Sequence, residues 1–180
     1  MFYMFFAEGF EEVEAIATLD VIRRAGIEIR SVGVDSLTVC GSHGISVVCD
    51  MKIDEITDYN DVEGIILPGG MPGTTNLCDC ADVHKAIDIC SQNKKLLCAI
   101  CAAPLILGRK GLLEGKEAVC FPGFEDELKG ATISNNFVCS DGNIITAKGM
   151  GSAINFGLAI VAAFKGQAAA DKLKSTLQCS

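Results

Sequence analysis

The hydrophobic and polar positions along the chain follow two alternating patterns. Short apolar runs typical of buried strands alternate with segments in which apolar residues recur at helical spacing. The predicted strands cover residues 2–7, 27–34, 62–67, 95–100, 118–121, 136–139 and 143–147, and the predicted helices cover residues 11–25, 81–92, 102–108, 152–164 and 167–177. This alternation predicts an α/β fold with a mostly parallel sheet covered on both faces.

A hairpin is predicted between the second strand and the next buried strand. Residues 37–40 and 45–49 are short β-branched segments around Gly41-Ser42-His43-Gly44, and they indicate an antiparallel edge hairpin. The chain shows no linker, repeat or low-complexity tract. We therefore expect residues 1–180 to form one domain, a flavodoxin-like three-layer sandwich with an edge hairpin.

Composition indicates the cellular compartment and whether the protein binds membranes. Apolar residues make up 49% of the chain, but no run approaches the roughly 18 positions that a membrane span needs. The apolar residues 1–7 have no basic flank, so they indicate a strand and not a signal peptide. The ten cysteines lie largely in apolar runs, which favours free thiols in a reducing compartment. We expect a soluble, cytoplasmic protein that does not bind membranes.

Charge and ligand spacing exclude several classes of partner. The net charge is −8, and the 15 Lys and Arg residues are not clustered, so nucleic acid is not expected. Cys78, Cys80 and His84 lack the second ligand pair of usual zinc sites, so no metal is predicted. The acidic loop at residues 8–12 lacks a phosphate-binding glycine set. FMN is therefore not expected, and no cofactor is predicted.

Cys101 ends a predicted strand and precedes a predicted helix with Pro104 in its first turn. A sharp strand-to-helix turn exposes its side chain at the carboxyl edge of the sheet, as in a nucleophile elbow. The helix N-terminus would then lower the thiol pKa below its free value of about 8.5. A plain buried cysteine is the alternative, because cysteines flanked by apolar residues are common in cores.

Two backbone N–H groups are candidates for an oxyanion hole. Residues 68–73, Pro-Gly-Gly-Met-Pro-Gly, end an adjacent strand, and we pair the N–H of Gly70 with that of Ala102. The alternative for Gly70 is a tight turn that needs a positive φ.

Glu14 is the candidate proton carrier. At helical spacing it shares a face with Phe10 and Val21, whereas Glu12, Arg23 and Arg24 can reach water. Partial desolvation would raise the pKa of Glu14 toward neutrality and couple its titration to that of the nearby cysteine. An ordinary surface glutamate is the alternative.

Other cysteine chemistries fit the pattern less well. A Cys–His–Asp triad would need His84, which lies among charged helix residues, or His43, which lies at a predicted turn. A thioredoxin-like pair would need Cys98 beside Cys101, but Cys98 lies within the strand and should face the opposite side of the sheet.

Three motifs in order give the chain a resemblance to a known family. They are Glu11-Glu12-Val13-Glu14, Leu67-Pro68-Gly69-Gly70 and Ala99-Ile100-Cys101-Ala102-Ala103-Pro104, with further likeness at residues 147–152 and 156–161. The chain resembles the ThiJ/PfpI superfamily, the family of the parkinsonism-associated DJ-one protein and its bacterial homologues, whose domain is class I glutamine amidotransferase-like. The resemblance implies a reactive Cys101, a protonated partner Glu14, and oxyanion donors at Gly70 and Ala102.

The chain departs from the family pattern at two positions. Phe121 stands where many members carry a histidine. Ser42-His43-Gly44 stands where an arginine commonly reaches the partner subunit's pocket, so His43 would be a titratable cation there. The resemblance also implies a homodimer, and we expect its contacts on the first helix, the hairpin and Met51.

Two functional hypotheses follow. The first is a glutathione-independent glyoxalase or deglycase-like enzyme that acts on small α-oxoaldehydes or their protein adducts, with Cys101 as nucleophile and Glu14 as proton shuttle. The alternative is a stress sensor or chaperone-like protein that works through oxidation of Cys101 without turnover. The fold alone does not choose between them.

Overall fold

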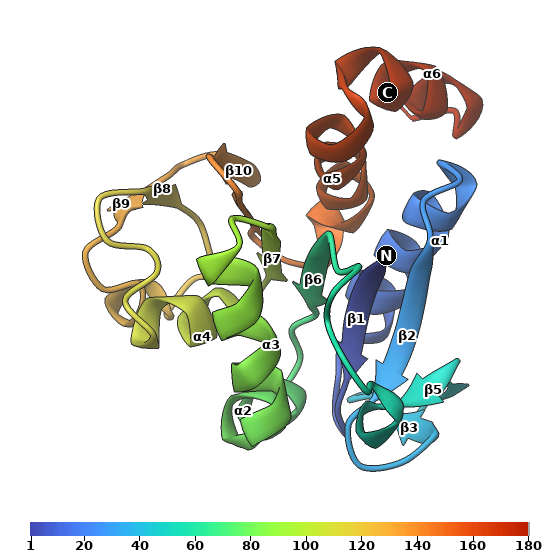
Figure 1. The fold of residues 1–180 in the computed structure, drawn as a ribbon. Coiled ribbons are helices and arrows are strands. Elements are labelled where there is room, and N and C mark those ends of the chain that lie inside the picture. Colours follow the sequence, from blue (N-terminus) through green and yellow to red (C-terminus); the bar gives the residue numbers. More distant parts are fainter. Residues whose placement is uncertain (180) are drawn as a thin grey trace.

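The computed structural model describes residues 1–179 and is built on a seven-stranded sheet (Figure 1). The strand order is β10-β11-β7-β6-β1-β2-β5, and every neighbouring pair is parallel except β10 and β11. The strands are β1 (Phe2–Phe6), β2 (Ile29–Gly33), β5 (Met51–Lys52), β6 (Gly64–Leu67), β7 (Leu96–Ile100), β10 (Val138–Asp141) and β11 (Ile144–Ala147). The predicted α/β class with a mostly parallel sheet is confirmed.

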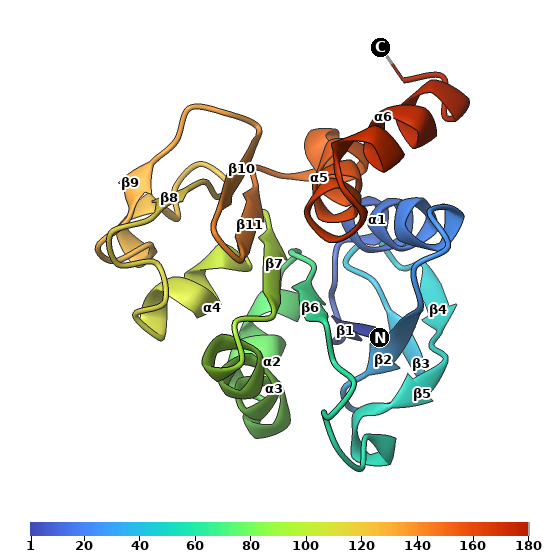
Figure 2. The ribbon, with the colours of Figure 1, turned by 45° about the horizontal axis from the view of Figure 1, so that its top comes forward.

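Helices cover both faces of the sheet, which gives three layers (Figure 2). One face carries α1 (Glu12–Arg24) and α5 (Ala153–Lys165), with α6 (Gln167–Thr176) packed against α5. The other face carries α2 (Gly73–Asp79), α3 (Ala81–Gln92) and α4 (Pro104–Arg109). Alternating residues of β1 enter the two cores, because successive strand side chains point to opposite faces: Phe2, Met4 and Phe6 to one, Phe5 to the other.

The predicted hairpin is present as a separate two-stranded antiparallel sheet of β3 (Thr38–Cys40) and β4 (Ser46–Val48). The edge strand of the main sheet is β5, which the sequence patterns did not predict. They also missed α2, β9 (Thr132–Ile133) and the 3₁₀ turns η1 (Ile53–Glu55), η2 (Glu125–Glu127) and η3 (Met150–Ser152). The strand predicted at residues 118–121 is present as the shorter β8 (Glu117–Ala118), which pairs in parallel with β9. Within residues 1–179, no helix has both the length and the apolar character needed to cross a bilayer.

The strand order reverses between β6 and β1. β1 lies between β2 and β6, so the chain turns to opposite sides after β1 and after β6. Ligands of open α/β sheets bind where strand order reverses in this way. The loops after β6 and the neighbouring β7 carry Gly70, Cys101 and Ala102 at the carboxyl edge of the sheet, and Glu14 lies in the first turn of α1, the helix that follows β1.

Candidate functional site

Cys101 lies immediately after β7 in a backbone conformation that non-glycine residues rarely adopt. Its φ is 65°, in the left-handed region, which costs an L-residue roughly 1–2 kcal/mol. Two hydrogen bonds hold it there: its N–H donates to Ala147 O at 2.9 Å, and its carbonyl oxygen accepts the Phe121 N–H at 2.8 Å. The turn leaves the thiol only partly buried. The backbone therefore makes the predicted sharp turn at Cys101, between β7 and α4.

Glu14 approaches the thiol from the first turn of α1. The Glu11 side chain caps this helix by accepting the Glu14 N–H at 2.7 Å. The Glu14 side chain is 1% exposed, and its Oε2 accepts the Gly69 N–H at 3.0 Å. Its carboxyl group also accepts the Met150 N–H and is hydrogen-bonded to the Cys101 thiol. The sequence prediction of a desolvated Glu14 next to Cys101 matches this arrangement.

Glycines after β6 make room for these two groups. A Cβ on Gly69 would lie 2.5 Å from Cys101 Cβ and 2.6 Å from Glu14 Oε2, so a side chain there would separate them. Gly70 has a φ of +89°, and a Cβ on it would lie 2.3 Å from Glu11 N. The turn requirement and the close backbone approach therefore both apply at Gly70.

The two predicted oxyanion donors converge on the sulfur. The backbone N–H groups of Gly70 and Ala102 are both hydrogen-bonded to the Cys101 side chain. They come from two different loops and point at one atom, which is the geometry of a site that stabilises negative charge. The same donors would stabilise a thiolate, a sulfinate or a tetrahedral oxyanion.

The thiol and the carboxyl share their protons. Burial raises the pKa of the Cys101 thiol, the charge and hydrogen bond of Glu14 raise it further, and the N–H groups of Gly70 and Ala102 lower it, with a result of about 12. The expectation of a lowered thiol pKa is therefore wrong, because burial outweighs the N–H groups that lower it. The helix invoked for it begins only at Pro104 and has six residues.

Burial also raises the pKa of Glu14, to about 7, although its hydrogen bond with Cys101 acts in the opposite direction. Between about pH 7 and pH 12 the pair thus holds one proton. A thiolate forms when that proton lies on Glu14.

A cavity of about 330 Å³ adjoins this pair. Its lining comprises Phe121, Pro122, Phe137, Lys148, Gly149, Met150, Gly151 and Ser152. A Cβ on Gly149 would lie 3.8 Å from Glu14 Oε1 and 3.3 Å from the Phe121 ring. Gly149, which belongs to the lining, therefore lies between the Phe121 ring and the Glu14 carboxyl.

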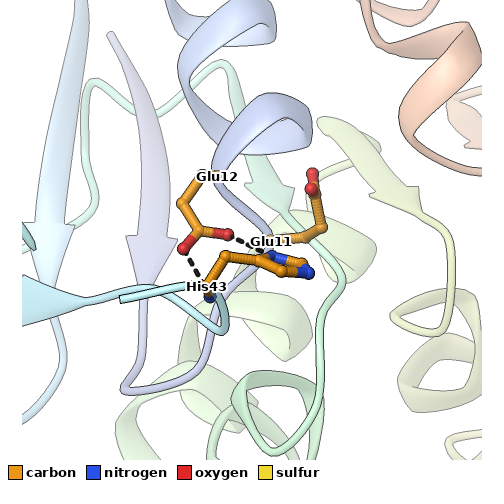
Figure 3. A group of neighbouring side chains, drawn as sticks. All are labelled: Glu11, Glu12 and His43. Atoms are coloured by element: carbon orange, nitrogen blue, oxygen red, sulfur yellow. Dashed lines mark hydrogen bonds and ion pairs between the residues drawn. The ribbon is translucent and has the colours of Figure 1, made fainter. Parts of the chain in front are cut away.

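At the hairpin turn, His43 contacts Glu12 of the same chain (Figure 3). Its Nδ1 lies 2.9 Å from Glu12 Oε2, and its backbone N–H donates to Glu12 Oε1 at 2.6 Å. The expectation that Glu12 reaches water is wrong, because the hairpin folds over it and leaves it 4% exposed. The ring of His43 remains exposed.

The groups of possible metal ligands in the structure differ from the Cys78, Cys80 and His84 group considered from the sequence. Within residues 1–179, Glu11, Glu12 and His43 are the group whose ligand atoms lie within 4.8 Å of one another, but both Glu12 oxygens already accept hydrogen bonds. Cys78 and Cys80 do not join His84 in such a group, and His84 is not simply solvated, because its Nε2 lies 2.6 Å from Cys78 O. No metal site was predicted there.

Cys98 is 1% exposed, and burial raises its thiol pKa. Cys101 packs against the same core as Cys98, so the argument from opposite faces is wrong: the left-handed turn at Cys101 ends the strand alternation. Burial is what separates Cys98 from the chemistry at the sheet edge. The other cysteines within residues 1–179 are also unpaired.

The fold and site together define a flavodoxin-like α/β protein with a cysteine elbow after β7, next to the point where the strand order reverses. Comparisons with known proteins agree. The sequence profile of the DJ-1/PfpI family matches residues 2–163. The chain is 37% identical over 175 residues to the protein named Protein DJ-1 homolog A of Arabidopsis thaliana, covering 95% of this chain and 44% of that one. It is 30% identical over 162 residues to the protein named Glutathione-independent glyoxalase DJR-1.2 of Caenorhabditis elegans, covering 88% of this chain and 85% of that one.

A solved structure described as Toxoplasma gondii DJ-1, oxidized, superposes with a TM-score of 0.94 at 32% identity over 99% of this chain and 98% of that one. The chain belongs to the DJ-1/PfpI family. It spans less than half the length of the Arabidopsis relative.

Proposed function

We propose that this protein is a cysteine-dependent enzyme that converts small α-oxoaldehydes, or their protein adducts, to 2-hydroxyacids. One observation carries the proposal: the Cys101 sulfur contacts both the Glu14 carboxyl and the N–H groups of Gly70 and Ala102. Nucleophile, proton carrier and anion donors thus meet at one point. The similarity to a protein named as a glutathione-independent glyoxalase supports it.

The proposed chemistry needs no external oxidant. The Cys101 thiolate forms a C–S bond with the aldehyde carbon, and the carbonyl oxygen becomes an alkoxide that Gly70 and Ala102 stabilise and Glu14 protonates. The Glu14 carboxylate then removes the proton from that carbon and returns it to the neighbouring ketone carbon. The aldehyde carbon is thereby oxidised as the ketone is reduced. Water cleaves the resulting thioester, releasing the hydroxyacid and regenerating the thiol.

The pKa of Glu14 fits this role. A group that accepts and donates a proton in one cycle works best when its pKa lies near the working pH. Burial raises the pKa of Glu14 to about 7. Glu14 can therefore carry the proton in one step and lack it in the next.

The test is formation of lactate from methylglyoxal without glutathione. Wild-type protein should form lactate, and Cys101→Ser should not, because serine is a poor nucleophile without a dedicated base. Cys78→Ser is the matched control, since Cys78 is also partly exposed but lies on α2. Equal lactate formation by wild type and Cys101→Ser would remove Cys101 from the reaction.

A second candidate function is redox sensing without turnover. The same N–H groups and the Glu14 proton would stabilise a Cys101 sulfinate after oxidation by a peroxide. The similarity to a structure described as oxidized favours this candidate. Wild-type protein that forms no lactate, but gains two oxygen atoms on Cys101 with peroxide, would support it.

We further propose that the protein is a cytoplasmic homodimer. Large apolar side chains are exposed where the contact was expected: Val13 and Ile16 on α1 and Ile45 and Val48 on the hairpin. A two-fold interface reuses one such patch on both subunits. The exposed ring of His43 lies on the same hairpin and remains the proposed cross-subunit contact. Light scattering of Val48→Asp against wild type tests the dimer.

A further inference from the structure

The cavity beside Cys101 and Glu14 presents apolar surface. Phe121, Phe137 and Met150 line it, and they are 47%, 67% and 55% exposed. Large apolar side chains gathered at one hollow commonly mark a ligand site.

The polar groups in the lining are already engaged. The Lys148 ammonium lies 5.6 Å from the centre of the Phe137 ring, where the ring face attracts it. The Ser152 hydroxyl donates to Gly149 O at 2.7 Å and accepts the Gly149 N–H at 3.2 Å. A ligand group in this cavity would therefore meet mainly aromatic and thioether surface, which favours an aromatic or bulky apolar group.

The cavity and the reacting pair share a wall. The Phe121 N–H donates to Cys101 O at 2.8 Å, and the Met150 N–H donates to the Glu14 carboxyl. Gly149 lies between the Phe121 ring and Glu14 Oε1. A substrate whose aldehyde carbon is at Cys101 would therefore have this apolar cavity beside it, on the far side of Gly149 from Glu14.

We propose that this cavity binds the substituent of the α-oxoaldehyde, and that Phe121 makes the enzyme selective for aryl or other bulky apolar substituents over methyl. This inference rests on the proposed function. It concerns a small molecule and not a second copy of the chain, because two residues of the cavity lining, Phe121 and Met150, contact Cys101 and Glu14 directly. The surface proposed for the dimer lies on α1 and the hairpin instead.

The test compares phenylglyoxal with methylglyoxal in wild type and Phe121→Ala. Removing the ring should lower kcat/KM for phenylglyoxal about tenfold or more beyond any loss for methylglyoxal, the range expected for lost apolar contacts in a pocket. Phe137→Ala, which removes the other ring of the lining, should lower kcat/KM for phenylglyoxal relative to methylglyoxal by a smaller factor. Ile133→Ala, an exposed apolar residue on β9 outside the lining, should leave both values at the wild-type level.

A proportional loss for both substrates in Phe121→Ala, or no loss for either, would overturn the inference while leaving the proposed function intact. If wild type turns over neither substrate, the proposed function fails. Binding of the two product acids, mandelate and lactate, then tests independently whether the cavity prefers a bulky apolar substituent. Calorimetry should then show mandelate binding more tightly than lactate in wild type and losing that advantage in Phe121→Ala. Equal affinities, or conversion of a wild-type dimer to monomer by Phe121→Ala, would show that the cavity does not select substituents.

Discussion

Glu12 and Glu14 lie two residues apart on α1, and both side chains are almost fully buried, at 4% and 1% exposure. Burial pushes the pKa of each carboxyl upward, yet the pKa of Glu12 ends at about 2 and that of Glu14 at about 7. The partners explain the difference. Glu12 is covered by the turn around His43, whose ring and backbone N–H both contact it. Glu14 is covered by the Cys101 thiol and two backbone N–H groups.

Glu12 is thus a structural carboxylate that stays ionised, whereas Glu14 titrates near neutral pH. Hydrogen bonds from the ring and backbone of His43 and from the Ile45 N–H stabilise the ionised form of Glu12, so that it ties the hairpin to α1 at every pH near neutrality. Glu14 has fewer donors and a neighbour that also carries a proton, so desolvation dominates. Burial alone therefore does not identify the functional carboxylate; the groups that bury it do.

The largest expected effect is on turnover. Glu14→Gln should lower lactate formation from methylglyoxal by about a hundredfold to ten-thousandfold, the range for loss of a general acid–base group. The fold should persist, because the amide oxygen can still accept the Gly69 N–H. Glu12→Gln should keep near-normal turnover per folded molecule. Full activity in Glu14→Gln would reverse the assignment of the two residues.

Stability should respond in the opposite order. Glu12→Gln should lower the free energy of unfolding by about 2 kcal/mol, because charge-assisted hydrogen bonds to the hairpin lose their charge. Urea unfolding with an unchanged slope would measure it. Asp20→Asn is a matched control, since its exposed ion pair with Arg24 should contribute less than about 1 kcal/mol. Equal midpoints for Glu12→Gln and the control would contradict the structural role.

The pH dependence of stability should reveal Glu14. Its pKa is raised from 4.5 in the unfolded chain to about 7 in the folded one, so between these values the folded state holds the extra proton. The free energy of unfolding of wild type should then fall as pH rises from about 4.5 to 7, relative to Glu14→Gln. The gap should change by an amount on the order of 1 to 3 kcal/mol. Parallel curves for the two proteins would place the pKa of Glu14 at its ordinary value.

The smallest effect belongs to His43. Its hydrogen bond and charge interaction with Glu12 raise the pKa of the imidazole above 6.5, so its stabilising contribution is complete below pH 6.5 and is lost as pH rises through the raised value. His43→Ala should therefore lower the urea midpoint slightly at pH 5.5 and leave it unchanged at pH 9. A pH-independent difference would show that the ring contributes by packing and not by charge.

Local patterns carried much of the fold and part of the site. The bounds of α3 match their prediction because its apolar spacing is local, and Cys101 could be located because a strand pattern ends at it. In contrast, α2 begins with Gly73, Thr74 and Thr75, which are weak helix formers. It depends on the burial of Leu77 and on the Thr74 N–H that donates to Gly70 O. The amphipathic pattern of a surface helix is therefore weak there.

Periodicity and turn chemistry within short segments were enough to predict the strands of the main sheet other than β5, the helices other than α2, the elbow at Cys101 and the burial of Glu14. How the buried groups titrate depends instead on contacts that form only in the folded chain. The turn that covers Glu12 is contributed by His43, 31 residues away, and the N–H that holds Glu14 by Gly69, 55 residues away. A pKa depends on desolvation and on every donor and charge within a few ångströms. Residues this far apart in the chain become such neighbours only when the sheet assembles, and the thiol predicted to be acidic is instead one half of a proton-sharing pair.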